Sequence, residues 1–306
     1  MNISGYILEE DLKTTNGANC RWGFAVRDGQ KFFIKELLSP VYPTDEVELS
    51  REVRDRKRNS CNQFALRQAM LYKAINDCSD GTLVHISEFF RFGSHYYITM
   101  PAIESLPEEL LYSGAFVAED RYRTSRLLIF SIGRLHRAGL IHGDLKMSNV
   151  LLTRSPGRNI TARIIDFEDC YWTSESPKPG DSIRVDQRYM APETFRLMMG
   201  EEERLTQAID VFSLGLMIHE ILTGNFPKYD SQYDYPFEAV LSGSPLMILK
   251  NRLPDPFDIL LPRMLAAEPG SRITLAEAEK YFPDNGPYRN GAEIDGKNLF
   301  FRAGNL

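Results

Sequence analysis

Several features that would assign a chain to a broad class are missing from this one. Its 306 residues contain no apolar run of the roughly 18 residues that a membrane helix needs, and the first residues lack the charged and then apolar pattern of a signal peptide. Asp and Glu number 42 against 36 Lys and Arg, so no excess of positive charge is available to attract nucleic acid. We therefore expect neither a membrane nor a nucleic acid as a partner.

Cysteine is also scarce. The four cysteines are far apart in the sequence, and no two of them form a Cys-x-x-Cys pair: they are Cys20, Cys61, Cys78 and Cys170. This spacing argues against both a disulfide framework and a zinc site. Few and widely spaced cysteines are typical of proteins in a reducing compartment, so we expect a cytoplasmic protein.

The composition itself is that of an ordinary globular protein. Hydrophobic residues make up 43% of the chain and charged residues 25%. A chain of this length and balance can bury one large core or two modest ones. A basic run at residues 51–58 is interrupted by acidic side chains, so we interpret it as the solvated face of a helix and not as a binding patch.

The first hundred residues favour strands. Apolar and other side chains alternate over residues 22–26, and an Asp28-Gly29 pair follows shortly after. Asp-Gly between two such runs is typical of a two-residue hairpin turn. Residues 32–34 are apolar and lead directly into Lys35. We therefore predict a β-hairpin whose second strand carries Lys35.

One helix interrupts these strands. Apolar residues recur with roughly helical spacing and predict one buried stripe; they are Phe64, Leu66, Met70, Leu71 and Ile75. An Asp80-Gly81 pair ends this pattern. Two further strand-like runs follow, at residues 83–92 and 96–100.

The chain becomes helical in character after residue 101. Periodic apolar segments cover residues 122–138, 209–223, 256–265 and 275–281, with breakers between them. We predict an α+β fold of two lobes.

The first lobe, residues 1–100, is expected to be small and rich in strands, with one main helix. A hinge at residues 101–103 would join it to a larger α-helical lobe at residues 104–282. Residues 283–306 are rich in Gly, Asn and charge, and we expect them to form a loosely held tail.

Two short motifs in the helical half carry chemistry: His-Gly-Asp-Leu-Lys-Met-Ser-Asn at residues 142–149 and Ile-Asp-Phe-Glu at residues 165–168. Phosphoryl transfer needs a carboxylate to take the proton of the attacking hydroxyl, a cation beside the transferred group, and oxygen ligands for a phosphate-bound metal. The candidates, in that order, are Asp144 as base, Lys146 as cation, and Asn149 and Asp166 as Mg²⁺ ligands.

Two further residues complete this set. Lys35 would reach the α- and β-phosphates of ATP from its strand, so ATP and Mg²⁺ are the expected cofactors. Glu168, the last residue of the second motif, is either an additional metal contact or an acid that faces solvent after the strand.

The order of these motifs resembles that of eukaryotic-type protein kinases, including the bacterial kinases of this type, over residues 6–282. Residues 188–193, Arg-Tyr-Met-Ala-Pro-Glu, are similar to the end of an activation segment. The resemblance implies that Asp210, in Asp-Val-Phe-Ser-Leu-Gly, braces the backbone of the catalytic loop. It also implies that Arg272 is the partner of the activation-segment glutamate, Glu193.

The same resemblance implies a nucleotide site. Met100 corresponds to the gatekeeper, Pro101 to Ile103 correspond to the hinge, and Leu151 would lie beneath the adenine. A proline fits at the hinge because the family uses the carbonyl group there and an N–H two residues later. Three further side chains would stack as the regulatory spine: Tyr72, His142 and Phe167.

The small lobe departs from the kinase pattern at three points. The nucleotide loop, which ends at Trp22, has one glycine, Gly17, where the pattern has three, so its backbone would cradle phosphates less closely. Phe33 replaces the small alanine that roofs the adenine. Gln68 replaces the helix glutamate that pairs with the strand lysine, so Lys35 would have a neutral partner unless Glu48 or Glu52 takes this place in a different helix register.

The large lobe departs at two more points. Gly143 replaces the arginine that in many protein kinases binds a phosphorylated activation segment, so we expect activity without segment phosphorylation. Asp186 stands where serine/threonine kinases carry a threonine. A carboxylate there would either repel Asp144 or help to hold Lys146.

Three functions are compatible with these residues. We favour an ATP- and Mg²⁺-dependent serine/threonine protein kinase of an atypical branch, because Lys146 follows the catalytic Asp and the Ala-Pro-Glu segment is present. A pseudokinase that acts as a binding scaffold is the second possibility, because of Phe33, Gln68 and the nucleotide loop. The motifs His-Gly-Asp and Ile-Asp-Phe-Glu are similar to those of aminoglycoside and choline kinases, which makes a small-molecule kinase the third. The sequence gives no oligomeric state.

Overall fold

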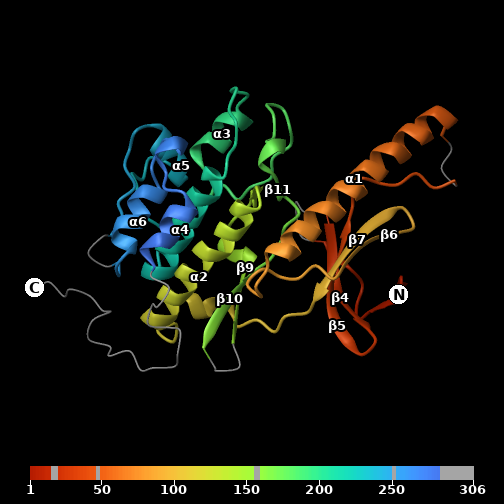
Figure 1. Cartoon of the computed structure of the whole chain (residues 1–306), viewed down its shortest axis with the longest axis horizontal. Coiled ribbons are helices and arrows are strands. Elements are labelled where there is room, and N and C mark those ends of the chain that lie inside the picture. The colour runs from red at the N-terminus through yellow and green to blue at the C-terminus, as the bar shows by residue number, and fades with distance from the viewer. Residues whose placement is uncertain (15–19, 46–48, 155–158, 250–252, 283–306) are drawn as a thin grey trace, which may run out of the picture. The chain divides into compact units, whose positions relative to one another are not determined.

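The computed structural model describes residues 1–14, 20–45, 49–154, 159–249 and 253–282. Gly17 of the nucleotide loop, Glu48 and the tail at residues 283–306 lie outside these ranges. The chain divides into two compact units, Met1–Glu104 and Ser105–Leu306. The first unit is a curled sheet with one long helix and the second is mainly helical, which confirms the predicted α+β fold (Figure 1).

The first unit contains a seven-stranded sheet with the order β1-β2-β4-β5-β7-β6, and β3 pairs with β4. Its elements are β1 Asn2–Ile3, β2 Tyr6–Leu8, β3 Lys13–Thr14, β4 Cys20–Arg27, β5 Gln30–Leu37, α1 Arg51–Cys78, β6 Glu88–Phe92 and β7 His95–Pro101. All the pairings are antiparallel. The chain can therefore fold this sheet largely from neighbouring hairpins.

The predicted hairpin is confirmed. Asp28 and Gly29 both adopt positive φ angles, 51° and 75°, as a two-residue turn of the type favoured by Asp-Gly requires. The register that follows places Trp22 opposite Lys35 and Phe24 opposite Phe33. Because side chains alternate along a strand, these four residues share one face of the sheet.

The opposite face of the sheet carries the core of the first unit. Ala25 and Ile34 are fully buried there together with Tyr6 and Tyr97. Glu36 lies on this face as well. Its carboxylate pairs with the guanidinium of Arg21 and accepts a hydrogen bond of 2.7 Å from the Tyr97 hydroxyl.

Glu36 makes the stability of the protein depend on pH. Burial of Glu36 raises its pKa, but the hydrogen bonds from Arg21 and Tyr97 outweigh burial and hold the pKa below its usual value. A lowered folded-state pKa stabilises the protein above the unfolded value of about 4.3, and this stabilisation is lost as the pH falls through the folded pKa. We expect Glu36→Gln to cost about 1–3 kcal/mol at pH 7.

The test is urea denaturation of the wild type and of Glu36→Gln at pH 7 and at successively lower pH values. Their difference in stability should shrink as the pH falls below about 4. Glu88→Gln is the matched control, because Glu88 forms an exposed ion pair with Arg27 in the same sheet and should contribute less than about 1 kcal/mol. A difference that grows on acidification would contradict the assignment.

The long helix α1 begins at Arg51, so it includes the basic run at residues 51–58 and extends beyond the strands (Figure 1). The Ser50 side chain caps its first turn. The predicted apolar stripe is wrong at two positions, because Leu66 and Met70 are 65% and 57% exposed. The buried face instead contains Cys61, Gln68, Leu71, Tyr72 and Ile75. The predicted strand at residues 83–92 forms only over Glu88–Phe92.

The second unit surrounds one buried helix. Its helices are α2 Ala118–Arg137, α3 Pro192–Met198, α4 Ala208–Thr223, α5 Pro236–Leu241, α6 Phe257–Met264 and α7 Leu275–Ala278. Its strands are β8 Leu140–Ile141, β9 Val150–Arg154, β10 Ile160–Ile164 and β11 Tyr171–Trp172. Short 3₁₀ turns cover Glu108–Tyr112, Met147–Asn149, Thr173–Glu175, Pro269–Ser271 and Glu279–Tyr281.

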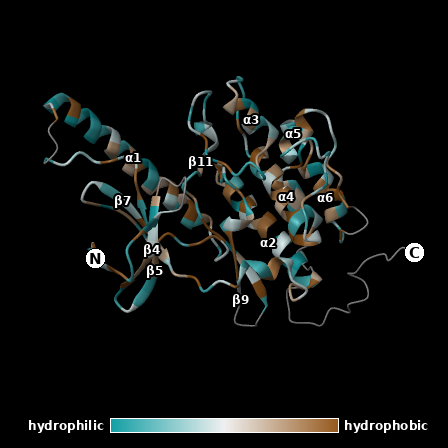
Figure 2. Ribbon diagram, turned by 180° about the vertical axis from the view of Figure 1, so that it is seen from behind, coloured by the Kyte–Doolittle hydropathy of each residue, from teal (hydrophilic) through white to brown (hydrophobic). Residues whose placement is uncertain are grey.

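Helix α4 is the centre of this unit. All residues at positions 209–221 are buried, and Figure 2 shows hydrophobic residues along much of its length. A helix that is buried on all sides belongs to the interior of a domain. The four predicted helical segments are confirmed, with a start four residues earlier in α2 and with α7 ending early in a 3₁₀ turn. No helix in the described part of the chain combines the length and apolar character needed to cross a membrane.

Candidate active site

A pair of short strands brings two of the predicted metal ligands to one place. Strands β9 and β10 are antiparallel, and Val150 lies opposite Ile164. Asn149 immediately precedes β9 and Asp166 closely follows β10, so both lie at the same end of this pair. The N–H of Ile165 continues the ladder by donating to the carbonyl of Asn149 at 2.9 Å.

A second pair of strands positions the start of the catalytic loop. Strands β8 and β11 are antiparallel, with Ile141 opposite Tyr171. Continuing this register beyond the strands places Gly143 opposite Asp169. The first motif thus leaves β8 directly beside the residues that follow the second motif.

Asp144 is held by contacts on both carboxylate oxygens. Oδ2 pairs with the ammonium group of Lys146, and Oδ1 accepts from the N–H of Asp186 at 3.2 Å. The Nδ2 of Asn149 donates to the Asp144 carbonyl at 2.8 Å. The Asp144 side chain is only 11% exposed. The predicted base is therefore both oriented and partly shielded from water.

The carboxylate of Asp186 contacts Arg188, a partner that its sequence position did not suggest. It accepts from the backbone N–H of Arg188 at 3.0 Å and also pairs with the Arg188 guanidinium. The backbone N–H of Asp186, and not its side chain, contacts Asp144. Repulsion between the two acids is reduced because Arg188 neutralises Asp186.

Asp210 holds the backbone of the catalytic loop. Its two oxygens accept from the N–H groups of His142 and Gly143, at 2.8 and 3.0 Å. His136 contacts the same carboxylate at 3.0 Å. Burial raises the pKa of Asp210, but the contacts with His136, His142 and Gly143 lower it overall, so the group remains ionised. The start of α4 is in this way fastened to the loop that carries Asp144.

Glu193 and Arg272 form a buried ion pair. The two guanidinium nitrogens of Arg272 reach the two oxygens of Glu193, at 2.5 and 2.9 Å, and both side chains are only 1% exposed. Arg272 also donates to three backbone carbonyls, those of Ala208, Ala266 and Ala267. This network ties the end of the activation segment to the start of α4.

The donor set near the second motif suits a hard divalent cation. The Nδ2 of Asn149 donates to the Asp144 carbonyl, and the carboxamide oxygen, its only side-chain acceptor, can serve as a metal ligand. Asp166 adopts a left-handed backbone, with φ of 67°, and a non-glycine residue in this region commonly marks a functional site. Glu168 is half-buried.

In the described ranges no three His, Cys, Asp or Glu side chains gather as a metal site. An ion held by Asn149 and Asp166 would therefore depend on phosphate oxygens for its other ligands. Mg²⁺ behaves in this way in phosphotransferases, since it keeps several waters and takes few protein ligands. The residues present fit the expected ion.

The candidate nucleotide residues of the first unit lie near the middle of the sheet. Lys35 is 9% exposed and Met100 is 8% exposed. Phe33 stacks on Trp22 with ring centroids 5.6 Å apart. Pro101 is the exposed last residue of β7, opposite Phe32.

The remaining candidates are divided between the two units. In α1, the Gln68 carboxamide contacts the side chains of Arg67 and Tyr72, at 3.2 and 3.5 Å. In the second unit, the rings of His142 and Phe167 lie 5.3 Å apart. Ile103 and Leu151 are half-buried, one in each unit.

Sequence reasoning missed two groups of residues. Glu220 in α4 is buried and accepts from the hydroxyls of Tyr112 and Tyr189, at 2.7 and 2.6 Å. Arg184 pairs with Asp169 at 2.9 Å. No local spacing in the sequence indicates such contacts, because the partners in each are at least 15 positions apart.

Comparisons with known proteins agree with this arrangement. Residues 49–282 match the protein kinase domain. Serine/threonine-protein kinase H1 of Homo sapiens is 25% identical over 207 residues, which cover 65% of this chain and 47% of that protein. A probable serine/threonine-protein kinase KIN1 homolog of Encephalitozoon cuniculi is 24% identical, over 90% of this chain and 45% of that protein.

A third relative is covered more completely. Serine/threonine-protein kinase SAPK3 of Oryza sativa subsp. indica is 24% identical, over 89% of this chain and 76% of that protein. The chain spans about half the length of the first two of these curated relatives. The family match at residues 49–282 includes the residues of the catalytic loop, the second motif and the buried ion pair.

Proposed function

The chain belongs to the protein kinase family, and we propose that it transfers the γ-phosphoryl group of ATP to serine and threonine hydroxyls of proteins. The contacts of Asp144 carry this proposal. A carboxylate that is fixed on both oxygens, next to a lysine two residues later, is what a base for a substrate hydroxyl requires.

In the proposed reaction, the substrate oxygen forms a bond to the γ-phosphorus as the bond from phosphorus to the ADP oxygen breaks. Asp144 orients the hydroxyl and accepts its proton. Lys146 lies beside Asp144 and offsets negative charge on the transferred group. Asn149 and Asp166, with Glu168 as an additional contact, would hold Mg²⁺, which neutralises phosphate charge when it is bound.

The residues of the first unit are assigned to ATP. Lys35 would bind the α- and β-phosphates, while Trp22, Phe33 and Met100 would contact the base together with the hinge at residues 101–103. Leu151 of the second unit and the nucleotide loop at Gly17 complete the assignment. Of the atypical features, Phe33 and Gln68 belong to the first unit, and we propose that they change how tightly ATP is bound and not which reaction occurs. Gly143 concerns how the activation segment is held.

A protein substrate is favoured over a small molecule by the activation segment. Residues 188–193 end in Glu193, which is anchored to Arg272, and such an anchor would be needed to support an extended peptide. The names of the relatives also support serine and threonine as acceptors. The widely spaced free cysteines favour the cytoplasm as the compartment.

The test is a transfer assay with labelled ATP and Mg²⁺. Acceptors are peptide libraries with Ser, Thr or Tyr as the only hydroxyl residue, together with an aminoglycoside and choline. We expect label in the Ser and Thr libraries at a rate at least about 100-fold above that of Asp144→Ala. Label in a small molecule alone would overturn the proposal in favour of a small-molecule kinase, and ATP binding without transfer would favour the scaffold.

A further inference from the structure

The position of Gly143 cannot carry a side chain in this structure. Its φ is 83°, a region that strongly favours glycine. A Cβ atom added there would lie 2.7 Å from the carbonyl oxygen of Asp169 and 3.2 Å from the ring of Tyr171. The arginine that many kinases carry at this point is therefore excluded by the backbone, so another contact must hold the activation segment.

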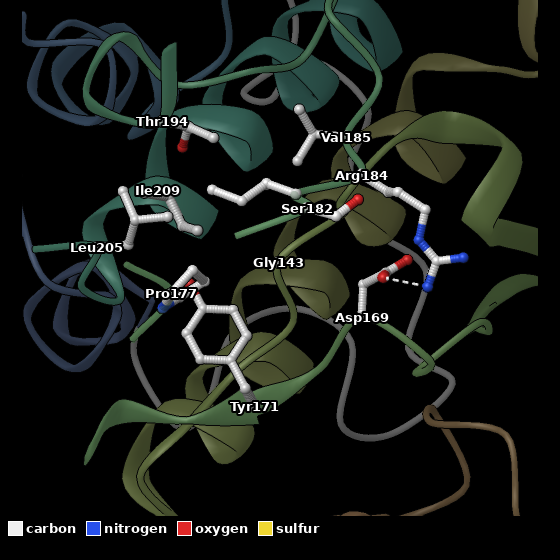
Figure 3. Close-up of a pocket in the computed structure, with 11 residues that line it drawn as sticks. Gly143, Asp169, Tyr171, Pro177, Ser182, Arg184, Val185, Thr194, Leu205 and Ile209 are labelled. Carbon is white, nitrogen blue, oxygen red and sulfur yellow. Dashed lines mark hydrogen bonds and ion pairs between the residues drawn. The ribbon is translucent and has the colours of Figure 1, made fainter. Parts of the chain in front are cut away.

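That contact is an ion pair in which the activation segment carries the cation, whereas in many kinases the segment carries a phosphate and the catalytic loop carries the arginine. Arg184, in the activation segment, donates to Oδ1 of Asp169, three residues after Asp166 in the second motif, at 2.9 Å. Figure 3 shows this pair beside Gly143, at the edge of a cavity of about 70 Å³ that Tyr171, Ser182 and Val185 also line. Arg184 supplies the cation, and Asp169, the residue directly after the second motif, supplies the anion.

The ion pair lies close along the chain to Asp186, the residue whose backbone contacts the catalytic base. Arg184 is two residues before Asp186, whose N–H donates to Oδ1 of Asp144. Fixing Arg184 therefore restricts the backbone that delivers this N–H.

We propose that the ion pair between Arg184 and Asp169 is a built-in latch that holds the activation segment beside the catalytic loop without phosphorylation. Arg184 is then a positioning residue for Asp144, acting through the N–H of Asp186. The effect on catalysis rests on the proposed function, whereas the latch itself does not.

The latch predicts the role of the hydroxyls in the segment. The Ser176 hydroxyl accepts from the N–H of Leu205 at 3.0 Å, so it has a structural function. Ser182 is two residues from Arg184, and a phosphate there would compete with Asp169 for the guanidinium. Modification at Ser182 would open the latch, and Ser182→Ala should leave turnover within about twofold of the wild type.

The test combines four variants in the full chain: Arg184→Gln, Arg184→Lys, Asp169→Asn and the double variant of Arg184→Gln with Asp169→Asn. Lys178→Gln is the matched control, because it removes an exposed cation from the same segment. Hydrogen exchange of residues 182–187 is measured first, with no nucleotide or substrate, and turnover is measured second. Circular dichroism establishes that each variant is folded.

The ion pair is partly exposed to water. Each of Arg184→Gln and Asp169→Asn should therefore raise exchange of the segment amides about two- to fivefold and lower kcat by a similar factor, with the KM for ATP changed less than about twofold. The double variant should be no worse than either single variant, and Arg184→Lys should retain most of the protection. Lys178→Gln should match the wild type.

The latch would be overturned if hydrogen exchange in Arg184→Gln were unchanged from the wild type. It would also be overturned if the effects of the two single variants added in the double variant. If exchange behaves as expected but no variant and not even the wild type transfers phosphate, the latch stands and the proposed function fails. The two conclusions are thus tested separately.

Discussion

Replacement of Asp144 by Asn is expected to lower kcat by about 10³-fold. The carboxamide has nearly the same shape and its oxygen can still accept from the N–H of Asp186. It cannot take up the proton of a substrate hydroxyl, and it removes the charge that holds Lys146. The chemical step therefore loses its base, while the surrounding loop keeps its contacts with Asp210.

Steady-state kinetics should place the loss in kcat, with the KM and the calorimetric affinity for ATP changed by less than about threefold. Ser148→Ala is the matched control, because Ser148 is exposed in the same loop, and its kcat should remain near that of the wild type. A kcat within about tenfold of the wild type in Asp144→Asn would mean that another group accepts the proton.

Replacement of Arg272 by Met is expected to destabilise the protein by about 3–5 kcal/mol. The guanidinium has its charge balanced by Glu193 and donates to three carbonyl groups, and it also lies over the ring of Phe212 at 4.9 Å. Methionine fills a similar volume but leaves the Glu193 carboxylate buried without its cation. The cost of that unpaired charge is the largest part of the effect.

Urea denaturation of the full chain measures this loss as a shift of the transition midpoint. The double variant of Arg272→Met with Glu193→Leu should recover part of the stability, because it removes the buried charge as well. Arg263→Met in α6 is the matched control, since Arg263 is exposed, and it should cost less than about 1 kcal/mol. A loss in Arg272→Met no greater than in this control would contradict the role of the ion pair.

The prediction of elements succeeded where the signal is local. The hairpin turn at Asp28 and Gly29 needs only two residues that tolerate a positive φ angle, and both residues adopt such an angle. It failed in α1, where Leu66 and Met70 were assigned to the buried face but are exposed. Apolar spacing identifies the helix, but the face that is buried depends on how the helix docks against the sheet.

The candidate site shows the same division. The two motifs contain Asp144, Asn149 and Asp166 in order, and the pairing of β9 with β10 brings the last two to one end. The partner of the Asp186 carboxylate was not foreseen, because two acids near a lysine allow several pairings. The contact with Arg188 follows from the turn of the backbone after Asp186.

By itself, the sequence predicted a phosphoryl-transfer site, because acid, amide and lysine occur at the spacing that this chemistry uses. It also determined the two-lobed α+β fold, because hydrophobic periodicity changes from strand to helix near residue 101. Only the tertiary structure decided how the site is held. The contacts of Arg184 with Asp169 and of Glu220 with Tyr189 join residues 15 and 31 positions apart, and chain folding, not local spacing, brings such partners together.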